Sequence, residues 1–295
     1  MSTQVPRLFD RLIDDAAVFP PGNAPLTEAV AGHRRHRAAA YADLVGPLLL
    51  PASALGHIPA LLATGERLAV GMIGDVPLEK LASVRDQTDP RLEIRQVEAA
   101  VAKRGEDPGP GLAELVGLAR RWPDLDVYAE VPLTWGLLTA LDEIARERAA
   151  GVRLAAKFRT GGLAAELFPT PVELAAVICA CRDRQLPFKL TAGLHHALRH
   201  TDPETGFTHH GFVNVLAATA AADDGAEVAA VAELLAATDP LRVVDPTRVR
   251  RDRNRPLWIG FGSCSVAEPV EDLVRLGLMH EGTASSIDER ERGRG

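Results

Sequence analysis

The sequence lacks the patterns that mark several large classes of protein. No apolar run within its 295 residues is long enough to cross a membrane. Residues 1–10 lack the basic-then-apolar order of a signal peptide. It has only three cysteines, Cys179, Cys181 and Cys264, an odd number without the spacing of a metal site. These absences predict a cytoplasmic protein with reduced thiols and no membrane partner.

An excess of positive charge is missing as well. The formal net charge is −7 at pH 7, and the basic clusters at residues 33–37 and 248–255 are short and interrupted. A nucleic-acid partner usually requires a basic face, so we expect none here. Hydrophobic residues make up 46% of the chain and charged residues 25%, which is enough to fill a sizeable core.

Eight apolar, strand-like runs alternate with helical patterns along the chain. They are found at residues 15–19, 46–50, 67–75, 92–97, 126–131, 151–157, 186–191 and 257–262. This alternation predicts an α/β protein of the (β/α)₈ type, a closed parallel TIM-type barrel. An open doubly wound sheet is the competing architecture. It is disfavoured because no Gly-x-Gly-x-x-Gly turn follows the first run.

The chain is predicted to form one domain with one long insertion. The barrel spans residues 1–280, and residues 194–256, between the last two strands, are far more than a barrel connection needs. They are predicted to contain a loop, a long Ala-rich helix from residue 212 to about 237 and an Arg/Asp-rich stretch at 239–256. Between the sixth and seventh runs the sequence predicts a helix with Thr170 as its N-cap and Glu173 three residues later. Long segments at the C-terminal face of a barrel are commonly lids or substrate walls. Residues 281–295, rich in small and charged side chains, predict a disordered tail. We expect a homo-oligomer, specifically a homodimer.

Two lysines carry the strongest chemical signal. Lys157 and Lys189 lie near the ends of the sixth and seventh runs, one β-α-β unit apart, which predicts side-by-side placement. Charged residues are rarely buried in a strand unless they are paired or used. Residues two apart share a strand face, so Arg159 accompanies Lys157 and Thr191 accompanies Lys189. Repulsion among these cations predicts a lowered lysine pKa and a neutral amine suited to a Schiff base.

Acids at neighbouring strand ends offer a structural alternative. Asp75 ends the third run and Glu130 lies at the end of the fifth, so both are predicted to point to the barrel mouth. In this alternative they hold Lys157 and Lys189 in buried ion pairs. Such pairs are poor stabilisers, which favours a chemical role for the lysines.

Glycine-containing turns follow the last three strands. They are Thr160-Gly161-Gly162, Ala192-Gly193 and Gly262-Ser263-Cys264-Ser265. Backbone amides at such turns form anion cradles, and barrels often bind phosphate after strands seven and eight. Tight turns alone also explain Gly161, Gly162 and Gly193. For the turn from Gly262 to Ser265 both interpretations stay open.

These strands resemble the class I aldolases of the deoxyribose-phosphate aldolase type. That family has a Schiff-base lysine before a Thr/Ser/Gly turn, a second lysine before Ala-Gly-Gly, and a phosphate-binding Gly-x-Ser-Ser turn. The matching pieces are Lys157 with Thr160-Gly161, Lys189 with Ala192-Gly193, and Gly262 with Ser263 and Ser265. The resemblance covers residues 151–198 and 258–270. It implies an imine on Lys157, a pKa tuned by Lys189, and proton transfer by Asp75 or Glu130.

Departures from the family pattern change the expected substrate. Phe158-Arg159 replaces small hydroxyl residues, and Leu194-His195-His196 replaces the second glycine and its neighbours. We therefore expect a carbon–carbon lyase for a small anionic carbonyl compound other than deoxyribose phosphate, with no cofactor. His195 or His196 is a candidate general acid or base. The residues expected to hold the anion are Arg159, Thr160, Gly161, Gly162, Thr191, Gly193, Gly262, Ser263 and Ser265.

Three alternatives remain open. In the first, a divalent metal ion such as Zn²⁺ binds the loop histidines, although their spacing matches no His-Glu-x-x-His signature. Those histidines are His195, His196, His200, His209 and His210. In the second, Asp75, Glu98 and Glu130 hold Mg²⁺ with Lys157 as the base of a lyase, isomerase or hydrolase. In the third, the barrel only binds a ligand.

Overall fold

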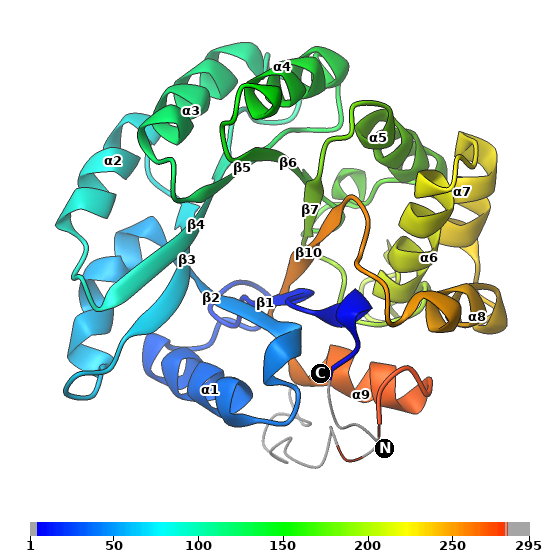
Figure 1. Cartoon of the computed structure of the whole chain (residues 1–295), viewed down its shortest axis with the longest axis horizontal. Coiled ribbons are helices and arrows are strands. Elements are labelled where there is room, and N and C mark those ends of the chain that lie inside the picture. Colours follow the sequence, from blue (N-terminus) through cyan, green and yellow to red (C-terminus); the bar gives the residue numbers. More distant parts are fainter. Residues whose placement is uncertain (1–4, 281, 283–295) are drawn as a thin grey trace.

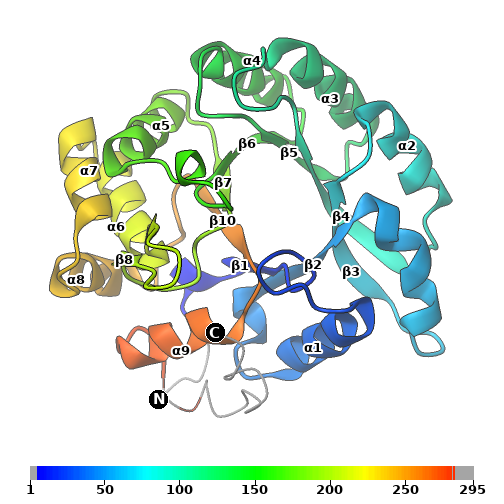
Figure 2. The same cartoon turned by 180° about the vertical axis from the view of Figure 1, so that it is seen from behind.

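The structure, a computed structural model, describes residues 5–280 and residue 282. Eight parallel strands close into a barrel in the order β1-β10-β7-β6-β5-β4-β3-β2, surrounded by helices (Figures 1 and 2). The strands are β1 (Ile13–Asp15), β2 (Val45–Pro51), β3 (Leu68–Gly74), β4 (Leu92–Ala100), β5 (Asp126–Glu130), β6 (Leu154–Arg159), β7 (Phe188–Thr191) and β10 (Trp258–Ser263). The predicted (β/α)₈ barrel is confirmed.

Helices cover the outside of this barrel. They are α1 (Leu26–Ala38), α2 (Leu78–Gln87), α3 (Gly109–Arg121), α4 (Leu137–Ala149), α5 (Pro171–Asp183), α6 (Phe212–Asp223), α7 (Val228–Ala236), α8 (Leu241–Arg250) and α9 (Ala267–Arg275). A 3-10 helix, Ala52–Leu61, connects β2 to β3 and contains Pro59. Shorter 3-10 helices are Arg7–Phe9, Ala42–Leu44 and Ala165–Leu167.

The hydrophobic core lies in the wall between strands and helices. Phe158 of β6 packs against Phe188 of β7, with ring centroids 6.1 Å apart. Phe261 of β10 stacks on Phe212 of α6, with centroids 5.7 Å apart. These strand residues point outward, so the residues that alternate with them face the barrel interior. The lysines of β6 and β7 are among those inward-facing residues.

Helix α5, which connects the two lysine strands, begins where the sequence predicts. Thr170 is its N-cap, and the Thr170 hydroxyl accepts a hydrogen bond from the backbone N–H of Glu173 at 3.2 Å. The Glu173 carboxylate in turn accepts from the backbone N–H of Thr170 at 2.7 Å. This capping box fixes the start of the helix and hence the length of the β6-α5-β7 unit.

Two predicted elements differ from the structure. The first strand is Ile13–Asp15 rather than 15–19, because the Asp15 carboxylate accepts the backbone N–H of Ala17 at 3.2 Å and turns the chain. The long helix expected from residue 212 is two helices, α6 and α7. Gly225 separates them, with a left-handed φ of +94°. The Arg/Asp-rich stretch that follows contains α8.

The connection between β7 and β10 has two parts. Residues 192–211 form a loop that contains the antiparallel hairpin β8 (His200–Thr201) and β9 (Thr208–His209). Helices α6 and α7 then lie outside the barrel beside α5, and α8 packs against α6 (Figure 1). Only the loop is therefore placed at the C-terminal ends of the strands. The tail predicted over residues 281–295 lies outside the described residues, apart from Gly282.

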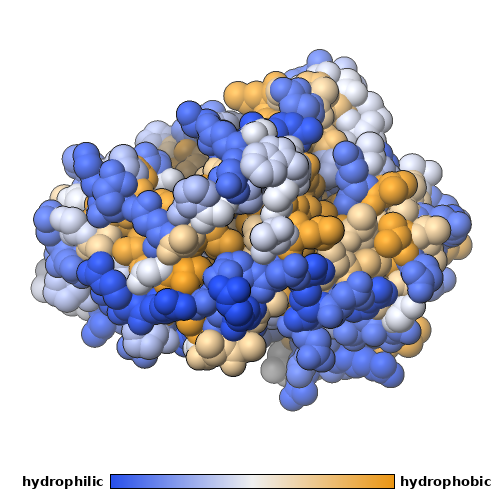
Figure 3. Space-filling model, turned by 90° about the horizontal axis from the view of Figure 1, so that it is seen from above, coloured by the Kyte–Doolittle hydropathy of each residue, from blue (hydrophilic) through white to orange (hydrophobic). Residues whose placement is uncertain are grey.

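Charged side chains also cover the exterior. One side of the molecule shows hydrophilic residues interspersed with hydrophobic ones (Figure 3). Trp135, 62% exposed, and Leu138 are among the large hydrophobic residues at the surface. Across residues 5–280 and 282, no helix has both the length and the apolar character that a membrane crossing requires.

Candidate functional site

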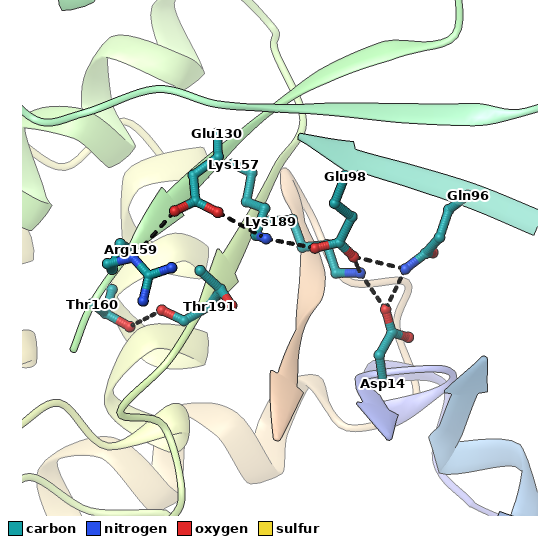
Figure 4. A network of polar contacts seen from close by, with 9 residues as sticks. All are labelled: Asp14, Gln96, Glu98, Glu130, Lys157, Arg159, Thr160, Lys189 and Thr191. Atoms are coloured by element: carbon teal, nitrogen blue, oxygen red, sulfur yellow. Dashed lines mark hydrogen bonds and ion pairs between the residues drawn. The ribbon is translucent and has the colours of Figure 1, made fainter. Parts of the chain in front are cut away.

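The inside of the barrel carries charged side chains where branched apolar residues are usual. Lys157 and Lys189 are direct partners in the register of β6 and β7, and Glu130 is the partner of Lys157 across β5 and β6. Glu98 from β4 and Asp14 from β1 point toward the same region (Figure 4). The two lysines are 4% and 2% exposed. The predicted side-by-side placement of the lysines is confirmed.

Each ammonium group lies between two carboxylates. Nζ of Lys157 is 2.7 Å from Oε2 of Glu98 and 2.9 Å from Oε2 of Glu130. Nζ of Lys189 contacts the carboxylates of Asp14 and Glu98. Glu98 therefore uses one oxygen for each lysine. The result is a continuous chain of alternating charges across the barrel, which we call the lysine–carboxylate chain: Asp14, Lys189, Glu98, Lys157 and Glu130.

Gln96 and Tyr128 support the Lys189 end of this chain. Nε2 of Gln96 donates to Oδ2 of Asp14 at 2.6 Å and to Oε1 of Glu98 at 2.8 Å. Nζ of Lys189 lies 4.9 Å from the centroid of the Tyr128 ring, a cation–π contact. Buried charges need this kind of full pairing, because a single unpaired charge would be strongly unfavourable.

The pKa values of the two lysines are raised, so the prediction of a lowered lysine pKa is wrong. Burial on its own would lower the pKa of Lys157, but Glu130 and Glu98 outweigh it. Burial likewise opposes the raised pKa of Lys189, and Asp14 and Glu98 outweigh it. Carboxylates lie between the cations, so attraction dominates over cation–cation repulsion. Both lysines rest as ammonium groups at neutral pH.

The three carboxyls of the chain differ from one another. Burial favours the neutral acid, but Lys157 and Lys189 lower the pKa of Glu98 to about 2. Burial also opposes Lys157 and Arg159 at Glu130, whose pKa is nevertheless lowered. At Asp14 burial prevails over the attraction of Lys189, and its pKa is raised. Asp14 is therefore the carboxyl of this chain that takes up a proton most readily.

Arg159 extends the chain to the barrel mouth. Its Nε donates to Oε1 of Glu130 at 3.1 Å, while Oε2 of Glu130 binds Lys157. The Arg159 side chain is 44% exposed, and its Nη groups make no hydrogen bond within the described part of the chain. A half-exposed guanidinium with free donors is a ready partner for an anionic group.

The turns after β6 and β7 pack backbone against backbone. A Cβ on Gly161 would lie 2.8 Å from Cα of Gly193, and Gly193 itself has a left-handed φ of +75°. The Thr160 hydroxyl donates to the carbonyl of Ala192 at 2.6 Å. A Cβ on Gly162 would collide with Leu167. The close approach of two loops thus explains these glycines, and the buried Thr160 fastens the loops rather than facing an anion.

The turn after β10 also uses its hydroxyls internally. Ser263 is buried and donates to the carbonyl of Ser265 at 2.6 Å, and the Ser265 hydroxyl accepts the backbone N–H of Glu268 at 3.3 Å. Gly262 faces the mouth, because a Cβ there would lie 4.0 Å from the Thr191 hydroxyl. Two of the predicted anion-binding residues therefore keep polar side-chain groups available for a ligand. Within the described residues, the Nη groups of Arg159 and the hydroxyl of Thr191 make no hydrogen bond.

Asp75 lies apart from the lysines. Its carboxylate accepts hydrogen bonds from the backbone N–H and the hydroxyl of Ser53, the former at 3.0 Å. The acids that hold the lysines are Glu130, Glu98 and Asp14. Asp14 is the residue that sequence reasoning missed, because the first strand was placed too late in the chain. Glu98 lies just beyond the predicted fourth run and inside β4, and its alternation with Gln96 was the available signal for it.

The five loop histidines do not converge on one point. His200 and His209 stack with ring centroids 5.2 Å apart, and His209 contacts the carbonyl of Gly193. His210 is buried against the carbonyl of Pro169 at 2.8 Å, and burial lowers its pKa to about 4. His195 and His196 contact different acids.

Neither alternative metal site is assembled. Among residues 5–280 and 282, no three His, Cys, Asp or Glu side chains are grouped to hold a metal ion. The set proposed from the histidines fails because these rings have separate partners. The set of Asp75, Glu98 and Glu130 fails because Lys157 lies between the two glutamates and Asp75 binds Ser53.

A cavity reaches the Lys189 end of the lysine–carboxylate chain from the end of the barrel opposite the mouth. It has a volume of about 360 Å³, and its lining includes Lys189, Asp14, Tyr128, Arg11 and Arg255. Arg11 and Arg255 precede β1 and β10, so the cavity lies at the N-terminal ends of the strands. Lys157 and Arg159 are absent from its lining. This cavity therefore reaches Lys189 and not Lys157.

Comparisons with known proteins do not indicate a function for this chain. The chain matches no protein-family model, and no curated protein shows significant sequence similarity to it. The barrel alone does not define a reaction, because unrelated chemistries share this fold. The arrangement of charged side chains inside the barrel must therefore carry the functional argument.

Proposed function

We propose that this protein is a carbon–carbon lyase of the aldolase type that acts on a small anionic carbonyl compound. The observation that carries the proposal is the placement of Lys157, buried beside Lys189 and linked through Glu130 to the half-exposed Arg159. Stabilising a fold rarely requires so many buried charges. The resemblance of β6, β7 and the turn after β10 to deoxyribose-phosphate-type aldolases supports the same chemistry.

Substrate binding has to release a proton from Lys157, because an imine forms only from a neutral amine. Glu130 is the group that takes it. In the free protein, one Glu130 oxygen binds Arg159 and the other binds Lys157 at 2.9 Å. An anionic substrate that binds Arg159 competes with Glu130 for the guanidinium. Glu130 then loses a contact that lowers its pKa and becomes a stronger base toward Lys157.

The neutral Lys157 amine attacks the carbonyl carbon of the substrate. A C–N bond forms, water leaves, and the protonated imine withdraws electrons as the neighbouring C–C bond breaks. The proton of the β-hydroxyl passes to a carboxylate as the aldehyde product departs and leaves an enamine on Lys157. The carboxylate returns this proton to the enamine carbon, and water then hydrolyses the imine, which releases the second product and the Lys157 amine. Lys189 remains charged and, through Glu98, helps to keep the site electrically balanced.

A proton-transfer enzyme is the second candidate. It is favoured by the raised pKa of both lysines, which keeps them as ammonium groups. In this candidate the Lys157 ammonium donates a hydrogen bond to a substrate carbonyl while a carboxylate removes the adjacent proton. The reaction would be an isomerisation or a β-elimination, without a covalent intermediate.

Reductive trapping separates the two candidates. The protein is incubated with borohydride and a panel of small aldehydes, ketones and 2-keto acids, with and without phosphate, and the adduct is located by peptide mapping. The matched control is Lys157→Arg, which keeps the charge and pairing but cannot form an imine. An adduct that disappears in Lys157→Arg supports the aldolase.

The remaining outcomes are also informative. Without an adduct, exchange of a substrate C–H proton with deuterated solvent would support the proton-transfer candidate. Binding of a carbonyl compound with neither trapping nor exchange would overturn both, and would leave a ligand-binding barrel.

A further inference from the structure

A thiol, an imidazole and a carboxylate meet at the C-terminal end of the barrel, outside the lysine–carboxylate chain. Cys264 follows β10 directly, His195 lies in the loop after β7, and Glu268 lies in the first turn of α9. Nδ1 of His195 is 3.5 Å from Sγ of Cys264 and 3.7 Å from Oε2 of Glu268. These are the chemical groups that activate a cysteine for nucleophilic attack.

Helix α9 fixes the position of the imidazole. Asp272, one turn after Glu268, accepts the backbone N–H of Ala197 at 2.7 Å and lies 3.5 Å from Nδ1 of His196. Residues four apart share a helix face, so Glu268 and Asp272 together hold the histidine loop. The chain before α1 holds the other side, because a Cβ on Gly22 would lie 3.0 Å from Cβ of Cys264. The thiol and the imidazole are thus oriented by packing on both sides.

The surroundings favour an imidazolium beside the thiol. Burial opposes the charge on His195, but Cys264 and Glu268 raise its pKa to about 10. The charged groups that face it are Cys264 and Glu268. The contact with Asp272 raises the pKa of the neighbouring His196, whereas burial lowers the pKa values of His200 and His209. Helix α9 begins three residues after Cys264, so the positive end of its dipole lies near this part of the chain.

The other two cysteines provide an internal comparison. Cys179 and Cys181 lie on α5 and are buried. Burial raises the pKa of Cys179 and raises that of Cys181 to about 12. Cys264 is partly exposed and has an imidazole partner. One chain therefore contains two inert thiols and one in an activating environment.

We propose that Cys264 and His195 form a nucleophilic thiol site that reacts with small soft electrophiles at the barrel mouth. The imidazolium of His195 holds the proton that Sγ has given up, and the sulfur attacks the electrophilic carbon. With an aldehyde, the S–C bond forms as the C=O π bond breaks, and the imidazolium returns its proton to the oxygen. The product is a thiohemiacetal, and no oxidant or reductant takes part. This site does not depend on imine formation at Lys157.

Alkylation kinetics with iodoacetamide test the proposal on the full chain. The S–C bond forms and iodide leaves, and intact mass with peptide mapping follows each thiol between pH 5 and 9. We expect a single adduct, on Cys264, that forms faster at pH 7 than the adduct of a free cysteine model compound. The rate at pH 7 should fall about tenfold or more in His195→Gln, because the imidazole 3.5 Å from Sγ is lost.

Matched variants separate activation from mere exposure. His196→Gln alters the adjacent ring and should keep the rate within about twofold, whereas Glu268→Gln should slow it severalfold by weakening the imidazolium. Cys264→Ser should abolish the adduct. A wild-type rate no faster than that of a free cysteine model compound, or an unchanged rate in a folded His195→Gln variant, would show an ordinary exposed thiol and overturn the proposal. The wild-type comparison decides alone if His195→Gln does not fold.

Discussion

Lys157 and Lys189 share Glu98 as an ion-pair partner but differ in their other neighbours. Lys157 continues through Glu130 to the half-exposed Arg159 at the mouth. Lys189 ends on Asp14, braced by Gln96 and Tyr128, and faces a cavity at the N-terminal ends of the strands. Substrates of (β/α)₈ enzymes bind at the C-terminal face. In the proposed mechanism the covalent role therefore belongs to Lys157 and an electrostatic role to Lys189.

Removing the shared partner gives the largest expected effect on stability. Glu98→Leu leaves two buried ammonium groups with one carboxylate contact each, and breaking a buried pair in this way costs about 3–5 kcal/mol. Denaturant unfolding should show a lower midpoint with an unchanged slope. Both lysines lose a partner in Glu98→Leu. Adding Lys157→Met and Lys189→Met to that variant should therefore recover part of the lost stability. A Glu98→Leu variant as stable as wild type would contradict the ion pairing described for the lysine–carboxylate chain.

Acid should lower the stability that the ion pairs of Glu98 provide. The pKa of Glu98 falls from its ordinary 4.5 to about 2 in the folded protein. A depressed carboxyl pKa adds stability above pH 4.5, and that stability is lost as the pH falls toward 2. For Glu98 the loss is about 3 kcal/mol. The raised pKa of Asp14 has the opposite sign and offsets part of it.

The measurement is the free energy of unfolding between pH 5 and pH 2 in wild type and in Glu98→Gln. The variant should lose less stability over this range, since its amide does not titrate. Parallel curves for the two proteins would mean that Glu98 is not held ionised by the lysines.

Arg159 tests the mouth side of the comparison. Arg159→Met should raise KM for an anionic carbonyl substrate about tenfold or more, because a charge-assisted hydrogen bond is lost. Stability should change by less than about 1 kcal/mol, since the side chain is 44% exposed. Kinetics with an uncharged analogue provide the control. Equal effects on charged and uncharged substrates would remove Arg159 from anion binding.

Asp75 should give the smallest effect. Asp75→Asn disturbs the contact with Ser53 and reaches neither lysine. We expect a change in unfolding free energy of about 1 kcal/mol or less and unaltered reductive trapping. Loss of trapping in this variant would restore Asp75 to the site that the sequence predicts for it.

The sequence predicts the barrel and the lysine pair, because both follow from patterns that are local in the chain. One β-α-β unit separates Lys157 from Lys189, and the alternation of strands and helices repeats over the whole chain. The partners of Lys189 are different. Asp14 and Glu98 lie 175 and 91 positions away, and no local pattern links them to it.

The mistaken direction of the lysine pKa has the same origin. Reasoning along the strands counts the cations that share a face, Lys157, Lys189 and Arg159. It cannot count the carboxylates that closure of the barrel brings from β1 and β4. The pKa depends on the sum of both, and here the carboxylates outweigh the neighbouring cations. The buried lysines and the partner on the adjacent strand, Glu130, were predictable, whereas the pairing with Asp14 and Glu98 required the closed sheet.

The position of a trapped adduct tests the central claim most directly. Wild type, Lys157→Arg and Lys189→Arg are each reduced with borohydride in the presence of the carbonyl panel, and the modified lysine is located by peptide mapping. The account predicts an adduct on Lys157 in wild type and in Lys189→Arg, and none in Lys157→Arg. An adduct on Lys189 that persists in Lys157→Arg would contradict it, and would move the chemistry to the opposite end of the chain.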